Sequence, residues 1–192
     1  MSSPRQTGKS VAKSHPFFVQ QMGSTSFNRD GRQIIPPAAI EGAVVSIQQK
    51  EVRLFEDTDG LASFFFSMWQ TIRDTWRDSW QEGNKLLGKV GIVCVAQYLT
   101  DALVQLSDLD LLDLANPIAV STRVTEMLSY QAPRLWEVEW VSASYDTKAG
   151  RAAVVEALVR IGRNLRRGLS WHEEVKLVDP ASIGEADSPS GR

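Results

Sequence analysis

The segment from Leu61 to Leu103 limits the possible folds of this chain more than any other part of the sequence. It holds two helix-length stretches joined by the hinge Glu82-Gly83-Asn84. One face of the first stretch collects large apolar residues, namely Leu61, Phe65, Met68, Trp69, Ile72, Trp76 and Trp80. This spacing is that of an amphipathic helix and predicts a helix over about 58–81, which Thr58 or Asp59 could cap.

The second stretch, residues 86–103, is apolar on nearly every side, and this pattern indicates a helix that is surrounded by others. Gly88 and Gly91 are three residues apart and would let another backbone come close, with the tryptophan face of the preceding helix as the expected neighbour. Since the tryptophans lie at helical spacing on an apolar face, we interpret them as core and not as the lining of a ligand groove.

Local signals predict three more helices. The first runs from Pro36 to about Ile47, because two prolines suit a first helical turn and apolar residues follow at helical spacing. The second runs from Pro117 to about Tyr130, with Asn116 as its candidate N-cap. The third spans about 147–167 and has a buried stripe of Val154, Leu158, Ile161 and Leu165.

Two segments leave alternatives open. Residues 107–113 alternate Leu with Asp and fit either a short helix or a loop. Residues 135–145 alternate apolar and polar side chains as a strand does, but no partner strand can be named. We therefore expect either a strand or an ordered connection in that place.

The sequence thus predicts a mainly α protein, a single-domain bundle of about five helices with little or no strand. A length of 192 residues and an apolar fraction of 43% suit one hydrophobic core. Residues 1–14 hold few large apolar groups, and residues 179–192 are rich in Ser, Pro, Gly and acidic residues. We expect these two ends to be disordered and the domain to span residues 15–178.

Composition also limits the partners and the cellular setting. A formal net charge of -2 gives no global field to attract DNA or an anionic membrane, so such binding requires a local patch. The single cysteine, Cys94, lies in an apolar run and fits a reducing, cytoplasmic environment. No stretch approaches the roughly 20 apolar residues of a membrane span. We expect a cytoplasmic protein that does not enter a membrane.

One local basic patch lies on the last predicted helix. Arg160, Arg163 and Arg167 project from the side opposite its buried stripe, and Arg166 lies beside them. Guanidinium groups bind phosphate oxygens in fixed geometry, so these arginines are a candidate nucleic-acid site. In the competing interpretation the arginines are a solvated helix face. They interact favourably with the negative C-terminal end of the helix macrodipole and pair with Glu156. The second interpretation is preferred, because no aromatic residues interleave with the arginines to stack on bases.

No spacing in the sequence is typical of a catalytic, metal or nucleotide site. Thr7-Gly8-Lys9-Ser10 is similar to the end of a P-loop, but Ser3 occupies the place of the required first glycine. His15 and His172 have no spaced partner for a metal. The two glutamates after His172 are adjacent to it in sequence, and adjacent side chains rarely face each other. We expect no enzymatic activity, no metal and no cofactor.

A series of motifs along the chain resembles a known family. The motifs are Ser14-His15-Pro16-Phe17-Phe18, the helix from Pro36, the helix with Phe66 and Trp80, and Leu86-Leu87-Gly88-Lys89-Val90-Gly91-Ile92 at the entry to an apolar helix. In order and spacing, they resemble the C-terminal part of DGQHR-domain proteins over about residues 15–103 and, more loosely, 140–161. Such proteins are similar to ParB-like proteins and are often encoded with DNA modification or defence systems. Asp30-Gly31-Arg32-Gln33 does not reproduce the motif that names the family, so no functional residue carries over.

Three hypotheses about function follow. The preferred one, which the resemblance implies, is a non-enzymatic helical module that binds a protein, or itself, within a DNA modification or phage-defence assembly. The alternative is a DNA-binding regulator that uses the four arginines. The third is an enzyme with a pocket assembled from scattered residues such as Glu41, His172 and Glu173. Self-association is expected if apolar surface is left uncovered.

Overall fold

The computed structural model of the protein describes residues 35–142 and 144–183. Their helices, in order, are α2 (Pro37–Gln48), α3 (Arg53–Glu56), α4 (Thr58–Thr75), η1 (Arg77–Ser79), η2 (Lys85–Leu87), α5 (Lys89–Asp108), α6 (Pro117–Leu128), η3 (Pro133–Trp136), α7 (Lys148–Arg166) and η4 (Pro180–Ser182). These residues contain no β-sheet, and an isolated antiparallel bridge joins Trp140 to Val178. The predicted mainly α class, with about five long helices, is confirmed.

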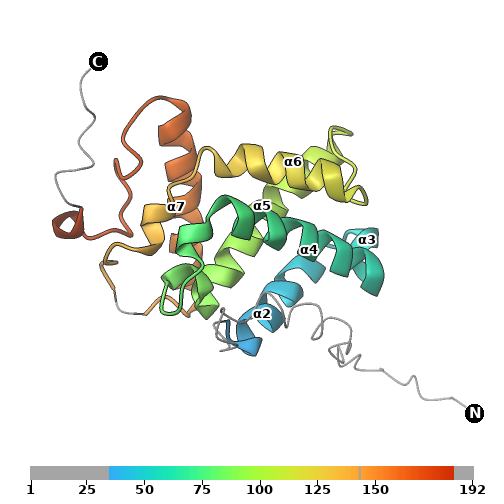
Figure 1. Cartoon of the computed structure of the whole chain (residues 1–192), viewed down its shortest axis with the longest axis horizontal. Coiled ribbons are helices and arrows are strands. Elements are labelled where there is room, and N and C mark those ends of the chain that lie inside the picture. The colour runs from blue at the N-terminus through green and yellow to red at the C-terminus, as the bar shows by residue number, and fades with distance from the viewer. Residues whose placement is uncertain (1–34, 143, 184–192) are drawn as a thin grey trace, which may run out of the picture.

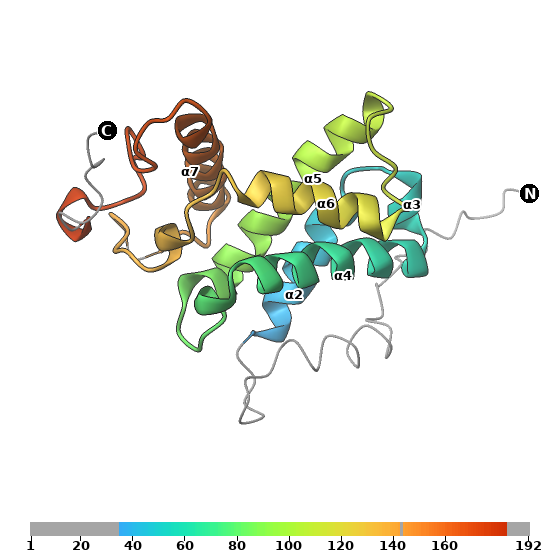
Figure 2. The same ribbon diagram turned by 45° about the horizontal axis from the view of Figure 1, so that its top comes forward.

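Helix α5 lies at the centre of the bundle, as predicted. It packs against α2, α6 and α7, whereas α4 packs along α6 (Figure 1). Figure 2 shows α6 in front of α5 and α7 at the end of α6. By length and hydropathy α5 could also cross a membrane, but half of its apolar window is buried inside the bundle. A helix that is enclosed by other helices has the same length and hydropathy, so burial in the bundle accounts for the apolar character of α5.

The prediction that the tryptophan helix packs directly along the apolar helix after it is wrong, because each of the two helices packs closely against a different helix. The close helical partner of α5 is α2, and that of α4 is α6. The buried stripe of α2 contains Ala39 and Ala43, and a Cβ atom added at Gly42 would lie 2.9 Å from Val93 Cγ2. Small residues thus bring α2 close to α5, while the bulky aromatic face of α4 needs a wider space.

Trp69 and Trp76 are core residues, as predicted, and Trp80 is partly buried against the core, but helix α4 ends earlier than expected. Its last helical residue is Thr75, and a 3-10 turn follows, so residues 76–81 do not continue the helix. The rings of Trp69 and Trp80 lie 6.2 Å apart in an edge contact. Eleven residues of α-helix would separate the two positions by about 16 Å, so the chain must turn back for this contact to form. Trp69 and Trp76 are both buried.

Gly91 is required for close packing, but not against the tryptophan face. A Cβ atom there would collide with the carbonyl groups of Lys85 and Leu86, which belong to the short helix η2. At Gly88, the N-cap of α5, an added Cβ atom would lie 3.4 Å from the Lys85 carbonyl oxygen, an ordinary contact. Gly91 therefore lets the chain fold tightly back onto the start of α5.

Side-chain caps fix the starts of three of the α-helices. Asn116 caps α6 as predicted, with its Oδ1 accepting hydrogen bonds from the amides of Ile118 and Ala119. Thr147 accepts from the Gly150 amide at the start of α7. At α4 the cap is Asp57, and not the predicted Thr58 or Asp59, because Asp57 has extended backbone and accepts from the third residue after it.

In the residues that the structure describes, both ambiguous segments are connections and not strands of a sheet. Residues 107–113 contain the end of α5 and a loop. Residues 135–145 contain the end of η3 and the bridge at Trp140, where the Val141 amide donates to the Leu177 carbonyl oxygen. The strand-like alternation arises because Trp136 and Val138 are buried, whereas Glu137 and Glu139 are exposed.

Several predictions fall outside the described residues. They concern the disorder of residues 1–14, most of the tail after 183, the similarity of Thr7-Gly8-Lys9-Ser10 to a P-loop, and His15. Within the predicted tail, Asp179 accepts a hydrogen bond from the Ala181 amide, and its own amide donates to the Glu139 carbonyl oxygen.

Candidate binding surfaces

The four arginines proposed as a nucleic-acid site do not form one uniform patch. Arg160 is half-buried, and its Nη1 lies 2.9 Å from Glu174 Oε2. The guanidinium carbon of Arg166 lies 5.6 Å from the ring centroid of Tyr130, within cation–π range. Arg163 and Arg167 are exposed and form no ion pair with any described residue. Two of the four side chains are therefore already occupied within the fold.

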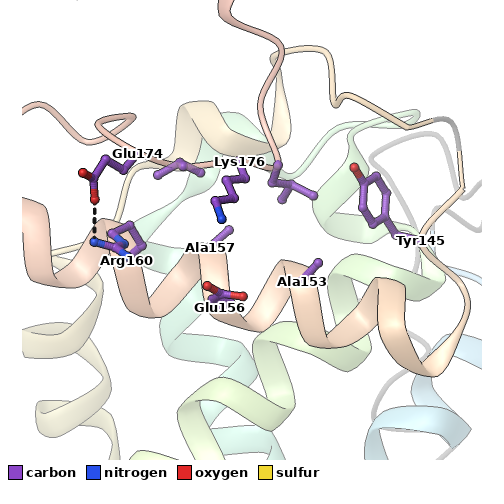
Figure 3. Close-up of a pocket in the computed structure, with 9 residues that line it drawn as sticks. Tyr145, Ala153, Glu156, Ala157, Arg160, Glu174 and Lys176 are labelled. Atoms are coloured by element: carbon purple, nitrogen blue, oxygen red, sulfur yellow. Dashed lines mark hydrogen bonds and ion pairs between the residues drawn. The ribbon is translucent and has the colours of Figure 1, made fainter.

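A shallow cavity lies between α7 and residues 174–177 (Figure 3). Its volume is about 140 Å³, well below the roughly 300 Å³ at which pockets for drug-sized ligands begin. Two basic and two acidic side chains balance in its lining, which consists of Tyr145, Ala153, Glu156, Ala157, Arg160, Glu174, Val175, Lys176 and Leu177. A cavity of this volume is too small for a drug-sized ligand.

The cavity contains none of the scattered residues proposed for an enzyme pocket. Glu41, on α2, and His172 and Glu173 are absent from its lining. The ring of His172 makes an edge contact with Trp171 at 5.4 Å. Glu174 has a left-handed backbone, with φ of 55°, and its carboxylate binds Arg160. Among the described residues, no group of three His, Cys, Asp or Glu side chains could hold a metal ion.

Sequence reasoning missed a buried polar cluster between α5 and α7. Gln131 Nε2 donates hydrogen bonds to the Tyr98 hydroxyl at 2.8 Å and to the Leu158 carbonyl oxygen at 3.0 Å. Gly162 leaves room for it, since an added Cβ atom would lie 2.9 Å from Gln131 Nε2. Burial raises the pKa of Tyr98, so the phenol is neutral. The cluster joins helices and carries no reactive group.

Asn164 is a second polar residue that the sequence did not indicate. It is buried on α7, and its Nδ2 donates to the carbonyl oxygens of Trp171 at 3.3 Å and Glu173 at 2.7 Å. These bonds hold the 171–174 turn against α7 and place Glu174 beside Arg160. The sequence did offer one sign of this role, because Asn164 is an amide residue at a position of the helix that the apolar spacing places toward the core.

The loop between α5 and α6 presents apolar side chains to solvent. We define residues 108–118 as the acidic loop. Leu109, Leu111 and Ile118 are 67%, 63% and 79% exposed. Asp108 precedes them, Asp110 and Asp113 lie between them, and no basic residue occurs from 102 to 122. Single exposed apolar residues are ordinary, but three within eleven residues form a candidate contact surface.

Hydrogen bonds hold the acidic loop in a defined shape. Asp110 adopts a left-handed backbone, with φ of 57°, after the end of α5. Its amide donates to the Ser107 carbonyl oxygen, and the Leu111 amide donates to that of Leu106, which together form a Schellman motif. Asp113 accepts from the Ala115 amide just before the Asn116 cap. The exposed leucines are thus fixed in place.

A comparison with protein-family models, curated proteins and solved structures finds no match to the chain. The fold and its surfaces therefore carry the functional argument.

Proposed function

We propose that this chain is a non-enzymatic helical binding module whose partner is a protein surface with apolar and basic residues. The acidic loop supports this proposal. Its leucines and Ile118 are held in solvent by an ordered backbone, so covering them removes apolar area from water without a further cost of ordering the loop. The aspartates among them favour a basic partner and disfavour an acidic one.

The proposal includes action within a DNA modification or phage-defence assembly. Support for this setting comes from the resemblance of residues 15–103 to the C-terminal part of DGQHR-domain proteins. A module that binds through one loop is compatible with such an assembly, because its helical body can stay unchanged while the loop is covered.

Site-specific photo-crosslinking in the host cell tests the proposed function. A photoreactive amino acid is placed at Leu111, and the matched control carries it at Val141, which is 64% exposed on another part of the surface. We expect discrete protein adducts from position 111, with the crosslinked peptide rich in basic and apolar residues. Equal adduct patterns from the two positions would contradict the proposal.

The alternative is a DNA-binding regulator, and it is favoured by the exposure of Arg163 and Arg167 without an ion pair to any described residue. Binding through these arginines predicts DNA affinity that falls steeply as salt rises. A filter-binding titration against salt tests it, with Arg163→Gln and Arg167→Gln as the variant. Absence of DNA affinity at low salt would remove this alternative.

A further inference from the structure

We infer that the acidic loop of one copy binds the last turns of α7 in a second copy. This inference rests on the proposed function and names the partner. The surface of α7 concerned is here called the basic face. It comprises Tyr130, Val159, Arg163, Arg166 and Arg167, the first of which lies just after α6.

The basic face is apolar and cationic, as the proposed partner must be. Positions 159, 163, 166 and 167 follow the helical spacing i, i+4, i+7 and i+8, so they share one side of α7. Val159 is 42% exposed and Tyr130 38%. The Arg166 guanidinium lies over the Tyr130 ring, which fixes a cation beside apolar surface. Arg163 and Arg167 are exposed.

The two surfaces complement each other in charge and in apolar content. The acidic loop carries three aspartates around three exposed apolar side chains, and the basic face carries three arginines around two. None of the three aspartates forms an ion pair with a described residue. Opposite charges at the rim of an apolar contact guide association and exclude the reverse pairing of like surfaces.

The contact cannot form within one chain. The acidic loop ends in the first turn of α6, and the basic face begins just after that helix ends (Figures 1 and 2). Ile118 and Tyr130 are separated along α6, and a helical rise between these two positions amounts to about 18 Å. Binding therefore requires a second copy, and a pair of copies retains one free acidic loop and one free basic face.

Such a contact is heterologous, because a loop meets a different surface of its partner. Heterologous contacts build rings or open chains of copies and do not stop at a two-fold dimer. Two small surfaces give a weak interface, at or below the roughly 1,200 Å² at which standard interfaces begin. The association is accordingly expected at high protein concentration and to weaken as salt rises.

Light scattering and sedimentation velocity of the full chain test the inference. At low salt, we expect the average mass to rise with concentration and to pass the mass of a dimer. Raising the salt should return the mass to that of a monomer. A particle that stays monomeric at low salt and high concentration would overturn the inference.

Two variants test the surfaces, and a third is the control. The loop variant combines Asp108→Lys with Leu111→Lys, and the face variant combines Arg163→Gln with Arg167→Gln. The control combines Glu82→Lys with Val141→Lys, which changes the net charge as much as the loop variant does and also alters exposed residues. We expect the first two to be monomeric and the control to associate like the parent chain. Loss of association in the control as well would overturn the inference.

Mixing the variants gives the sharpest readout. The loop variant keeps an intact basic face, and the face variant keeps an intact acidic loop. An equal mixture should therefore form a one-to-one pair that does not grow. A mixture that stays monomeric would overturn the inference. Self-association of the face variant by itself would also overturn it, even if that variant had lost DNA binding.

Failure of this inference is distinguishable from failure of the proposed function. Crosslinks from position 111 to a different basic protein, with no self-association, would reject the second copy as partner and leave the binding module standing. Position-independent crosslinks together with a monomeric chain would reject both.

Discussion

At the residue scale, glycines and single polar groups decide how closely the chain packs. Gly91 and Gly162 each leave the space of one missing Cβ atom, the first for the backbone of η2 and the second for Gln131. The sequence marks Gly91 as significant, because it lies in an otherwise apolar helix. It does not identify the neighbour, because contacts with a preceding turn or with another helix look alike in sequence.

Gly91→Ala tests this view of close packing. The added methyl group collides with the carbonyls of Lys85 and Leu86, so the short helix η2 must move. We expect the free energy of unfolding to fall by about 1–3 kcal/mol. Urea unfolding followed by circular dichroism measures the change. Gly88→Ala is the control and should cost less, since its methyl group makes an ordinary contact.

At the scale of elements, the chain connects its helices through caps and a few ion pairs. Asp146, in the segment before α7, accepts from Lys89 Nζ at 2.8 Å and from Arg151 Nη1 at 2.9 Å. It thereby joins the start of α5 to the start of α7. The hydrogen bond from Lys89 is the main reason that the pKa of Asp146 lies below its usual 3.8.

Asp146→Asn is predicted to lower stability slightly at neutral pH. Because the folded pKa is depressed, the charged carboxylate stabilises the fold above the unfolded pKa of about 3.8, and this contribution disappears as pH falls through the folded value. Melting temperatures of the two proteins should therefore converge in acid. The effect is small, since the group is exposed and screened. A difference that persists unchanged at acid pH would contradict a charge effect.

At the scale of the whole molecule, one core joins helices α2 to α7. Cys94 lies within it on α5, with its Sγ 3.6 Å from the Arg151 carbonyl oxygen. Burial raises the pKa of its thiol to about 12. Since the thiolate is the reactive form, the folded protein keeps this cysteine inert.

We predict that Cys94 reacts with a thiol reagent only when the bundle unfolds. At mildly alkaline pH the reaction rate should follow the unfolded fraction as denaturant is added, and absorbance of the released thiolate measures it. Val141→Cys supplies an exposed thiol for comparison and should react at once. Equal rates for Cys94 and the exposed thiol under native conditions would contradict a single cooperative core.

Local patterns were sufficient for the elements. The 3.6-residue spacing in α4 and α7, the Asn116 cap and the all-round apolar character of α5 predicted these helices, with the bounds of α7 correct to one residue and the ends of α4 and α5 wrong by five or six. They predicted the tryptophans as core for the same reason, since a large apolar side chain at core spacing is buried in almost any bundle. The alternation of Leu and Asp marked the acidic loop in the sequence, but it did not predict that the leucines are exposed to solvent.

The sequence by itself determined the class of the fold, the helices and their apolar faces, because these depend on interactions between residues a few positions apart. Only the tertiary structure decided that α2 and not α4 lies along α5, that Arg160 pairs with Glu174, and that Leu109 and Leu111 remain in solvent. Each of these depends on which distant segments come together, and the periodicity of a single segment carries no information about its partner.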